Sequence, residues 1–346
     1  MTCVRSLLFA IGWWRGGTSV AVLLPKRIAR IGGEQRSCWE PAVAAGQTAG
    51  AASQHSPTET GGLAPPVFAQ VWALAEHSMS RIVFLGTGGA RILVFKQLLA
   101  SGGMWMELGD ARFHIDPGPG ALVQATKRKL DPTKLDAIIL SHRHLDHAND
   151  INAMMEAMSQ GGTRPRGKVF VPSDALEGDP VVLRYVRGYV KEIVTLQPGG
   201  TYEAGGITFR CPLRLRHGVE AYGFIFDAPE GAVGYISDTD YFPELADAFR
   251  VDHLIINVLR TEPTAPLQHM SVPQAQELIA AIKPKVAILT HFGMTVWRAK
   301  PWEIAERMSQ ETGVRVIAAR DGMRYELEEG QGVSDRHIRP PAAPSD

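Results

Sequence analysis

Short apolar runs, separated by glycine, proline and charged residues, recur along the chain from Met79 to about Gly330. Most have the length of a β-strand and stop at a turn signal, which favours strands over helices. The predicted strands are Arg81–Leu85, Met104–Leu108, Arg112–Ile115, Ala137–Leu140, Lys168–Val171, Ile193–Leu196, Ile207–Arg210, Tyr222–Phe226, Val233–Ile236, Asp252–Val258, Val286–Leu289, Val314–Ala318 and Met323–Glu326.

Four longer segments have the apolar spacing of helices: Ala121–Lys129, Asp150–Ser159, Val272–Ile282 and Pro301–Glu311. Strands crowd the first part of this region, and strands alternate with helices in the later part. That order predicts an α/β domain built from layers of mixed sheets and helices.

The two ends of the chain have a different pattern. Residues 42–66 are rich in Ala, Gly, Ser, Thr and Pro without periodicity, which is typical of a linker or disorder. The apolar run Val20–Leu24 is far shorter than the ~20 residues that span a bilayer. We therefore interpret residues 1–78 as a disordered or over-called extension, 79–330 as the functional domain and 331–346 as a disordered tail.

Composition narrows the classes of protein to consider. The chain has 346 residues, 45% of them hydrophobic and 21% charged, which is globular composition. Lys+Arg and Asp+Glu both number 36, so no global field favours nucleic acid, and no dedicated nucleic-acid module is expected. Three cysteines without CxxC spacing exclude a disulfide framework and thiolate zinc fingers. Few cysteines also fit a reducing, cytoplasmic location.

One short segment gathers most of the chemistry. His142, His144, Asp146 and His147 lie within six residues, directly after the predicted strand Ala137–Leu140. In an extended segment alternate side chains share a face, so His142 and His144 should point the same way. Imidazole and carboxylate ligands suit zinc, manganese or iron. The plainer alternative is a surface turn that happens to be rich in His and Asp.

This segment resembles the HxHxDH signature of the metallo-β-lactamase superfamily. Four further motifs follow the pattern of that family in order and cover the chain from about Met79 to Leu327. They are Asp116 in HIDPGPG, His217 in RLRHGVEAYGF, Asp238 in GYISDTDYF and His291 in VAILTHFG.

The resemblance implies a fold and a ligand set. The fold would be a four-layer αββα sandwich with a dinuclear site at the sheet edge. One metal would be held by His142, His144 and His217, and the other by Asp146, His147 and His291, with Asp238 bridging and Asp116 supporting the metal loop from behind. Asp146 also counts among the catalytic groups. The cofactors would be two divalent ions, with Zn²⁺ favoured and Mn²⁺ or Fe²⁺ open, and a bridging hydroxide would be the nucleophile.

The expected substrate class comes from two further motifs. FLGTGG, near Met79, resembles the branch that includes ribonuclease Z and the cyclic-phosphate phosphodiesterases. His269, in LQHMSVPQAQELI, resembles a family histidine that precedes a helix and assists phosphodiester cleavage as a proton donor. A solvated histidine is the alternative. Ribonuclease Z itself is disfavoured, because the chain shows no evident tRNA-gripping arm.

These inferences predict a metal-dependent hydrolase of a small-molecule or short phosphodiester substrate, or of a cyclic phosphate. A hydrolase of a thioester or lactone stays open as an alternative, as does a metal-binding sensor without turnover. No membrane partner is expected, and a homodimer stays open.

Overall fold

A computed structural model describes residues 79–89 and 91–327. The extension predicted for residues 1–78 and the tail predicted for residues 331–346 lie outside the described residues. Within the described part, no helix is both long and apolar enough to cross a membrane.

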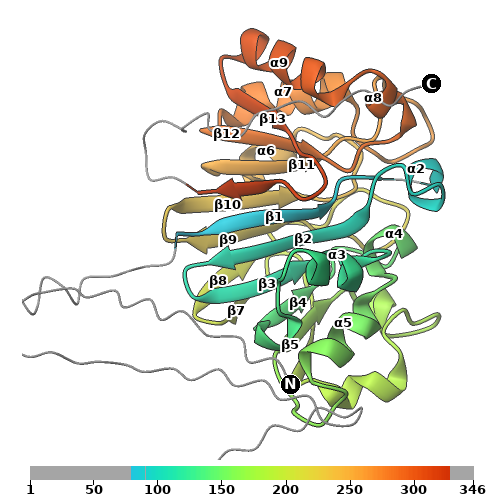
Figure 1. Cartoon of the computed structure of the whole chain (residues 1–346). Coiled ribbons are helices and arrows are strands. Elements are labelled where there is room, and N and C mark those ends of the chain that lie inside the picture. The colour runs from blue at the N-terminus through green and yellow to red at the C-terminus, as the bar shows by residue number, and fades with distance from the viewer. Residues whose placement is uncertain (1–78, 90, 328–346) are drawn as a thin grey trace, which may run out of the picture. The chain divides into compact units, whose positions relative to one another are not determined.

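The first sheet has seven strands in the order β14-β1-β2-β3-β4-β5-β6 (Figure 1). Pairing is antiparallel from β14 to β3 and parallel from β3 to β6. The strands are β1 (Arg81–Gly86), β2 (Ser101–Leu108), β3 (Ala111–Ile115), β4 (Ala137–Ile139), β5 (Lys168–Val171), β6 (Glu192–Thr195) and β14 (Arg324–Glu326).

The second sheet also has seven strands, in the order β13-β12-β11-β10-β9-β8-β7. Here β10 to β13 are parallel and β7 to β10 antiparallel. The strands are β7 (Thr201–Ala204), β8 (Ile207–Arg210), β9 (Phe224–Ala228), β10 (Gly231–Ile236), β11 (His253–Asn257), β12 (Val286–Thr290) and β13 (Arg315–Ala318).

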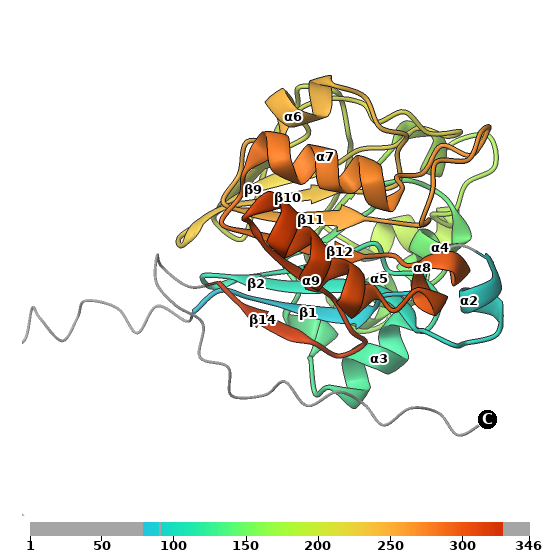
Figure 2. The ribbon, with the colours of Figure 1, turned by 90° about the horizontal axis from the view of Figure 1, so that it is seen from above.

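Helices cover the outer face of each sheet (Figure 2). Side chains of α3 and α5 share a core cluster with the first sheet, and those of α6, α7 and α9 share one with the second. The α-helices are α2 (Arg91–Phe95), α3 (Ala121–Lys127), α4 (Leu145–Ala148), α5 (Ile151–Met158), α6 (Glu244–Ala248), α7 (Val272–Ile282), α8 (Met294–Arg298) and α9 (Pro301–Thr312). The predicted four-layer αββα fold is confirmed.

Both sheets are buried on two faces, which explains their nearly continuous apolar strands. In β1, Ile82 and Phe84 face the core between the sheets, while Val83 and Leu85 face the helices. Aromatic rings meet across the central core, with Phe113 and Phe226 centroids 5.6 Å apart. Each such buried side chain contributes roughly 1.5–3 kcal/mol through burial alone.

The predicted elements match the structure closely where apolar spacing is clear: Lys168–Val171, Ile207–Arg210 and Val272–Ile282 have the predicted bounds. The sequence did not indicate β7, whose residues are mostly polar because it is an edge strand. It also did not indicate α2, α6 or α8, which have only five residues each and too little length for a helical period.

The parallel strands position the site. Asp116 follows β3 and His142 lies shortly after β4, while Asp238 lies just beyond β10 and His291 directly follows β12. All four therefore lie at the carboxyl ends of parallel strands, the edge at which open α/β sheets bind ligands. In Figures 1 and 2, α2, α4 and α8 lie near one another on the same side of the domain.

Candidate metal centre

The structure brings all seven predicted ligands together, although they span 150 positions of the sequence. Their donor atoms form overlapping clusters of three, each with its atoms within 4.8 Å of one another. The clusters are His142/His144/His217, Asp146/His147/His291, His142/His147/Asp238 and His217/Asp238/His269.

Two of these clusters are the two predicted metal sites, and in each a pair of imidazoles meets nitrogen to nitrogen. His217 Nε2 lies 3.0 Å from His144 Nδ1. His291 Nε2 lies 2.9 Å from His147 Nε2 and 3.4 Å from Asp146 Oδ2. The segment after His144 forms the short helix α4 rather than an open turn, and this helix carries Asp146 and His147.

Asp238 lies between the two groups. Its Oδ2 is 3.5 Å from His147 Nε2 and 3.8 Å from His142 Nε2, and its Oδ1 is 3.3 Å from His291 Nδ1. The side chain is only 2% exposed. One carboxylate thus contacts residues of both predicted sites, as the bridging position requires.

Hydrogen bonds at the outer nitrogen fix which nitrogen of each ring is available. His147 Nδ1 donates to Asp116 Oδ2 at 2.9 Å, and His217 Nδ1 donates to the Gln268 carbonyl at 3.0 Å. His142 Nδ1 lies 3.0 Å from the Ser141 hydroxyl, which itself donates to Asp116. In each ring Nε2 therefore keeps its lone pair for the centre of the cluster.

Burial and neighbouring charges shift the pKa values of the clustered side chains. Burial lowers the pKa of His142, His144 and His217. Burial also acts to lower the pKa of His147, but Asp238, Asp146 and Asp116 together hold it well above its ordinary value. Burial acts to raise the pKa of Asp238, yet His291 and His147 bring it well below its ordinary value. The cluster therefore presents ionised carboxylates beside neutral imidazoles at His142, His144 and His217. At His147 the carboxylates favour a positive charge, which a bound cation can supply in place of the proton.

The donor set fits metal cations. His142 Nε2 is fully buried and has no hydrogen-bond partner among the described residues. Two nitrogen atoms that carry lone pairs repel one another at 3 Å unless a proton or a cation lies between them. Nitrogen ligands at about 2.0–2.1 Å from a tetrahedral zinc are about 3.3 Å apart, close to the separations observed here. Imidazole and carboxylate donors without thiolate favour zinc, manganese or iron.

The backbone bends sharply at two of these positions. Asp116 and His291 have φ values of 51° and 57°, in the left-handed region that residues other than glycine rarely adopt. Such strain is concentrated at functional sites and persists because surrounding contacts determine it. Two glycines allow close approach: a Cβ atom on Gly89 would lie 2.2 Å from His291 Nδ1, and one on Gly118 2.0 Å from the Asp146 carbonyl oxygen.

His269, predicted as a proton donor, lies beside the bridge. Its Nε2 is 3.2 Å from Asp238 Oδ2, and its side chain is 19% exposed. This position suits a group that contacts both the cluster and solvent. Because His269 also forms a cluster of three with His217 and Asp238, the geometry allows it to be a ligand.

Three further residues, which the sequence did not single out, support the cluster: Ser141, Tyr235 and Asn257. All are buried, and each bonds to Asp116 or Asp238. Their signal was present in the sequence, because each is a polar residue within or just after an apolar strand run in the layer that carries the ligands.

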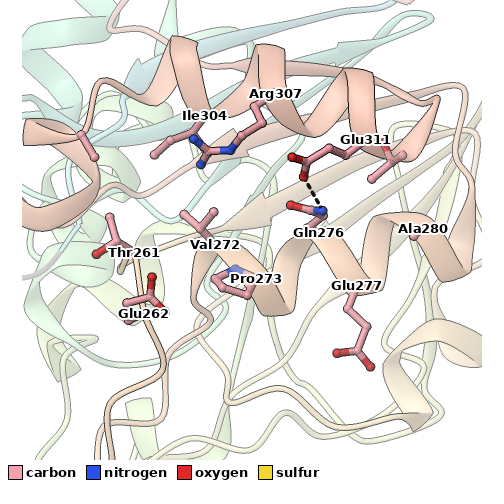
Figure 3. A pocket seen from close by; sticks show the side chains of 12 residues that line it. Thr261, Glu262, Val272, Pro273, Gln276, Glu277, Ala280, Ile304, Arg307 and Glu311 are labelled. Atoms are coloured by element: carbon pink, nitrogen blue, oxygen red, sulfur yellow. Dashed lines mark hydrogen bonds between the residues drawn. The ribbon is translucent and has the colours of Figure 1, made fainter.

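A cavity of about 430 Å³ lies elsewhere, between α7 and α9 (Figure 3). Its walls include Gln276 and Glu311, which hydrogen bond at 2.8 Å, and Arg307. None of its lining residues belongs to the His/Asp cluster. The candidate metal ligands thus lie in the cluster at the strand ends and not in this cavity.

Comparison with known proteins agrees with this geometry. The family model for the beta-lactamase superfamily domain matches residues 111–292, a range that contains all seven candidate ligands. The chain belongs to the metallo-β-lactamase superfamily. Membership of this superfamily makes the chain a metal-dependent hydrolase, without naming its substrate.

Two proteins have sequences similar to that of this chain. An uncharacterized protein of Methanocaldococcus jannaschii is 34% identical over 258 residues, covering 72% of this chain and 96% of that protein. Ribonuclease Z of a Bradyrhizobium species is 28% identical over 163 residues, covering 44% of this chain and 51% of the enzyme.

Two solved structures share the metallo-β-lactamase fold. The first is YhfI of Bacillus subtilis, a metallo-β-lactamase fold protein. It has a TM-score of 0.62 at 21% identity, covering 72% of this chain and all of that one. A diphosphatase of the PhnP family has a TM-score of 0.54 at 20% identity, covering 72% of this chain and 97% of that one.

Proposed function

We propose that this metallo-β-lactamase-fold protein is a dinuclear hydrolase of a small phosphodiester or cyclic phosphate. The observation that carries the proposal is the pair of three-residue clusters joined by Asp238. His142, His144 and His217 would hold one cation, and Asp146, His147 and His291 the other. Two bound cations supply an activated water as nucleophile and neutralise charge on the attacked group.

The chain's own residues perform the remaining tasks. Asp116 accepts the Nδ1 proton of His147 and so keeps that ring in one tautomer. Asp238 contributes a negative charge to both sites. His269, half-buried beside Asp238, is placed to donate a proton to the leaving oxygen. Asp146 is 20% exposed, so it lies between the buried ligands and the solvent from which substrate enters.

The phosphodiester class is supported by the names of similar proteins and by the FLGTGG motif. One relative is named ribonuclease Z, and one structural neighbour is a diphosphatase. Both names concern phosphorus–oxygen bonds. Net charge is zero, which favours a small substrate over a long polyanion.

The test is a substrate screen on protein loaded with Zn²⁺ or Mn²⁺. We expect hydrolysis of bis(p-nitrophenyl) phosphate and of a 2′,3′-cyclic nucleotide, and little or none of lactones or thioesters. Turnover of lactones or thioesters alone would replace the phosphodiester assignment. Inactivity on every ester class, with two metals bound per chain, would favour a metal-binding sensor.

Asp238 and His269 should respond differently to substitution. Asp238→Ala removes the shared carboxylate, so metal content should fall by at least one ion per chain or affinity by at least about tenfold. His269→Ala should keep both metals and lower turnover by about 10²–10⁴-fold, the usual range for a general acid. The loss should be smaller with a p-nitrophenyl leaving group, which needs little protonation. Elemental analysis of metal content, together with rates on activated and unactivated diesters, distinguishes these two roles. Metal loss in His269→Ala would make His269 a ligand.

A further inference from the structure

A chain of buried hydrogen bonds runs behind the ligands from Asp238 to Asp116. Asn257 Nδ2 donates to Asp238 Oδ1 at 2.8 Å and to the Tyr235 hydroxyl oxygen at 3.2 Å. The Tyr235 hydroxyl donates to Asp116 Oδ2 at 2.8 Å. All four residues are at most 4% exposed. One network therefore joins the bridging carboxylate to the carboxylate that orients His147.

Asn257 occupies a central place in this network because of its position in the sheet. It is the last residue of β11, which pairs with β10 on one side and β12 on the other. Asp238 follows β10 and His291 follows β12. Ile255, two residues earlier on the same strand face, belongs to the core between the sheets. An amide in such a core position is costly unless it is hydrogen-bonded, so its partners matter.

The direction of the amide follows from the chemistry of its partner. An ionised carboxylate only accepts hydrogen bonds, so the NH₂ side of Asn257 must face Asp238. This bond fixes Oδ1, which also lies 3.3 Å from His291 Nδ1. It turns Oδ2 toward His269, His147 and His142, at 3.2, 3.5 and 3.8 Å. A hydrogen bond to a buried charge is stronger and more directional than a neutral one.

We propose that Asn257 is a positioning residue that sets the orientation of the Asp238 carboxylate and thereby the affinity of the centre for its second cation. The inference rests on the proposed dinuclear function. It concerns a residue that is buried and is not itself among the clustered donor atoms. It acts through Asp238, to which its amide donates directly.

The experiment compares three variants of the full chain. Asn257→Leu removes both hydrogen bonds that the amide donates and keeps a branched side chain with the same number of heavy atoms. Asn257→Ser removes the direct bond but leaves a hydroxyl and space for a bridging water. Asn152→Leu is the matched control: Asn152 also makes two hydrogen bonds, to Val181 and Leu183, and none to the cluster.

The readouts are Zn²⁺ stoichiometry and affinity by chelator competition, the visible spectrum of the Co²⁺-loaded protein, and the unfolding temperature. Asn257→Leu should bind one of its two cations at least about tenfold more weakly and change the Co²⁺ spectrum. Asn257→Ser should recover part of the affinity. Asn152→Leu should lose stability and keep the parent's affinities and spectrum.

Parent-like affinities and spectrum in both Asn257 variants would overturn the inference, as would an equal affinity loss in Asn152→Leu. If Asn257→Leu does not fold, Asn257→Ser decides by the same readouts. These measurements need no substrate. A parent that hydrolyses no phosphodiester but shows the expected metal losses would refute the substrate proposal alone, whereas a parent that binds no metal would refute both.

Discussion

At the scale of single residues, His147 and His114 are both buried, but the first is a candidate metal ligand and the second is packed in a strand. Their hydrogen-bond partners explain this difference. His147 donates to a carboxylate and lies among three acids, which favour its charged form or a bound cation. His114 is fully buried and donates from Nε2 to the Gly102 carbonyl at 2.8 Å, and its Nδ1 has no partner within residues 79–89 and 91–327. Spacing in the sequence could identify the first as a candidate ligand and the second as a packed strand residue. It could not give the tautomer of either, because the partners come from distant segments.

His114 should make stability fall in mild acid. Burial lowers the pKa of His114 from about 6.5 to about 4, so the folded state resists a proton that the unfolded chain accepts. Its contribution is complete above about pH 6.5 and is lost progressively as the pH falls toward 4, by about 3 kcal/mol in all. His114→Gln should flatten this part of the curve, although the variant is less stable at pH 7. Urea unfolding of both proteins from pH 7 to 4, with EDTA present, makes the comparison. Parallel curves would contradict the prediction.

At the scale of elements, the order of strands and helices could be predicted because each buried strand has its own apolar run. The short helices and the polar edge strand β7 could not, since their stability comes from packing on neighbours rather than from local pattern. The loops between elements carry the chemistry. Their sequences, such as GTGG and DPGPG, indicated turns but not which ligand each turn would touch. A Cβ atom added to Gly89 would meet the His291 ring, and one added to Gly118 would meet the Asp146 backbone, 202 and 28 positions further along the chain.

Gly89→Ala tests the role of the first loop. The added Cβ would lie 2.2 Å from His291 Nδ1, so the ring or the loop must move. We expect at least about a tenfold loss of affinity at the site of Asp146, His147 and His291, with a smaller change in unfolding temperature. Gly218→Ala is the matched control, since Gly218 adjoins His217 and its added Cβ would meet only Gln268, at 3.9 Å. Zinc titration of both variants should separate them. Equal affinities would show that the loop yields without disturbing His291.

At the scale of the whole domain, the site exists only where two sheets meet. Four of the candidate ligands come from the loop and helix after β4 in the first sheet, and three come from segments of the second sheet region. The family resemblance could predict this set. The residues alone could predict only the cluster from His142 to His147, because the others lie singly in unrelated surroundings. The supporting network through Tyr235 and Asn257 required the packed structure, since its bonds link strands of both sheets.

A centre that joins both sheets should couple metal binding to global stability. Cations that bind only the folded state add about 2.7 kcal/mol per site at a hundredfold excess over the dissociation constant. For a domain of this size each kilocalorie raises the unfolding temperature by about 2–4 °C. Chelation should therefore lower the unfolding temperature by about 5–10 °C per site, and Zn²⁺ or Mn²⁺ should restore it at two equivalents. Mg²⁺ is the control, because it prefers oxygen ligands and keeps its water. Restoration by Mg²⁺, or a plateau at one equivalent of zinc, would contradict a dinuclear centre of imidazole donors.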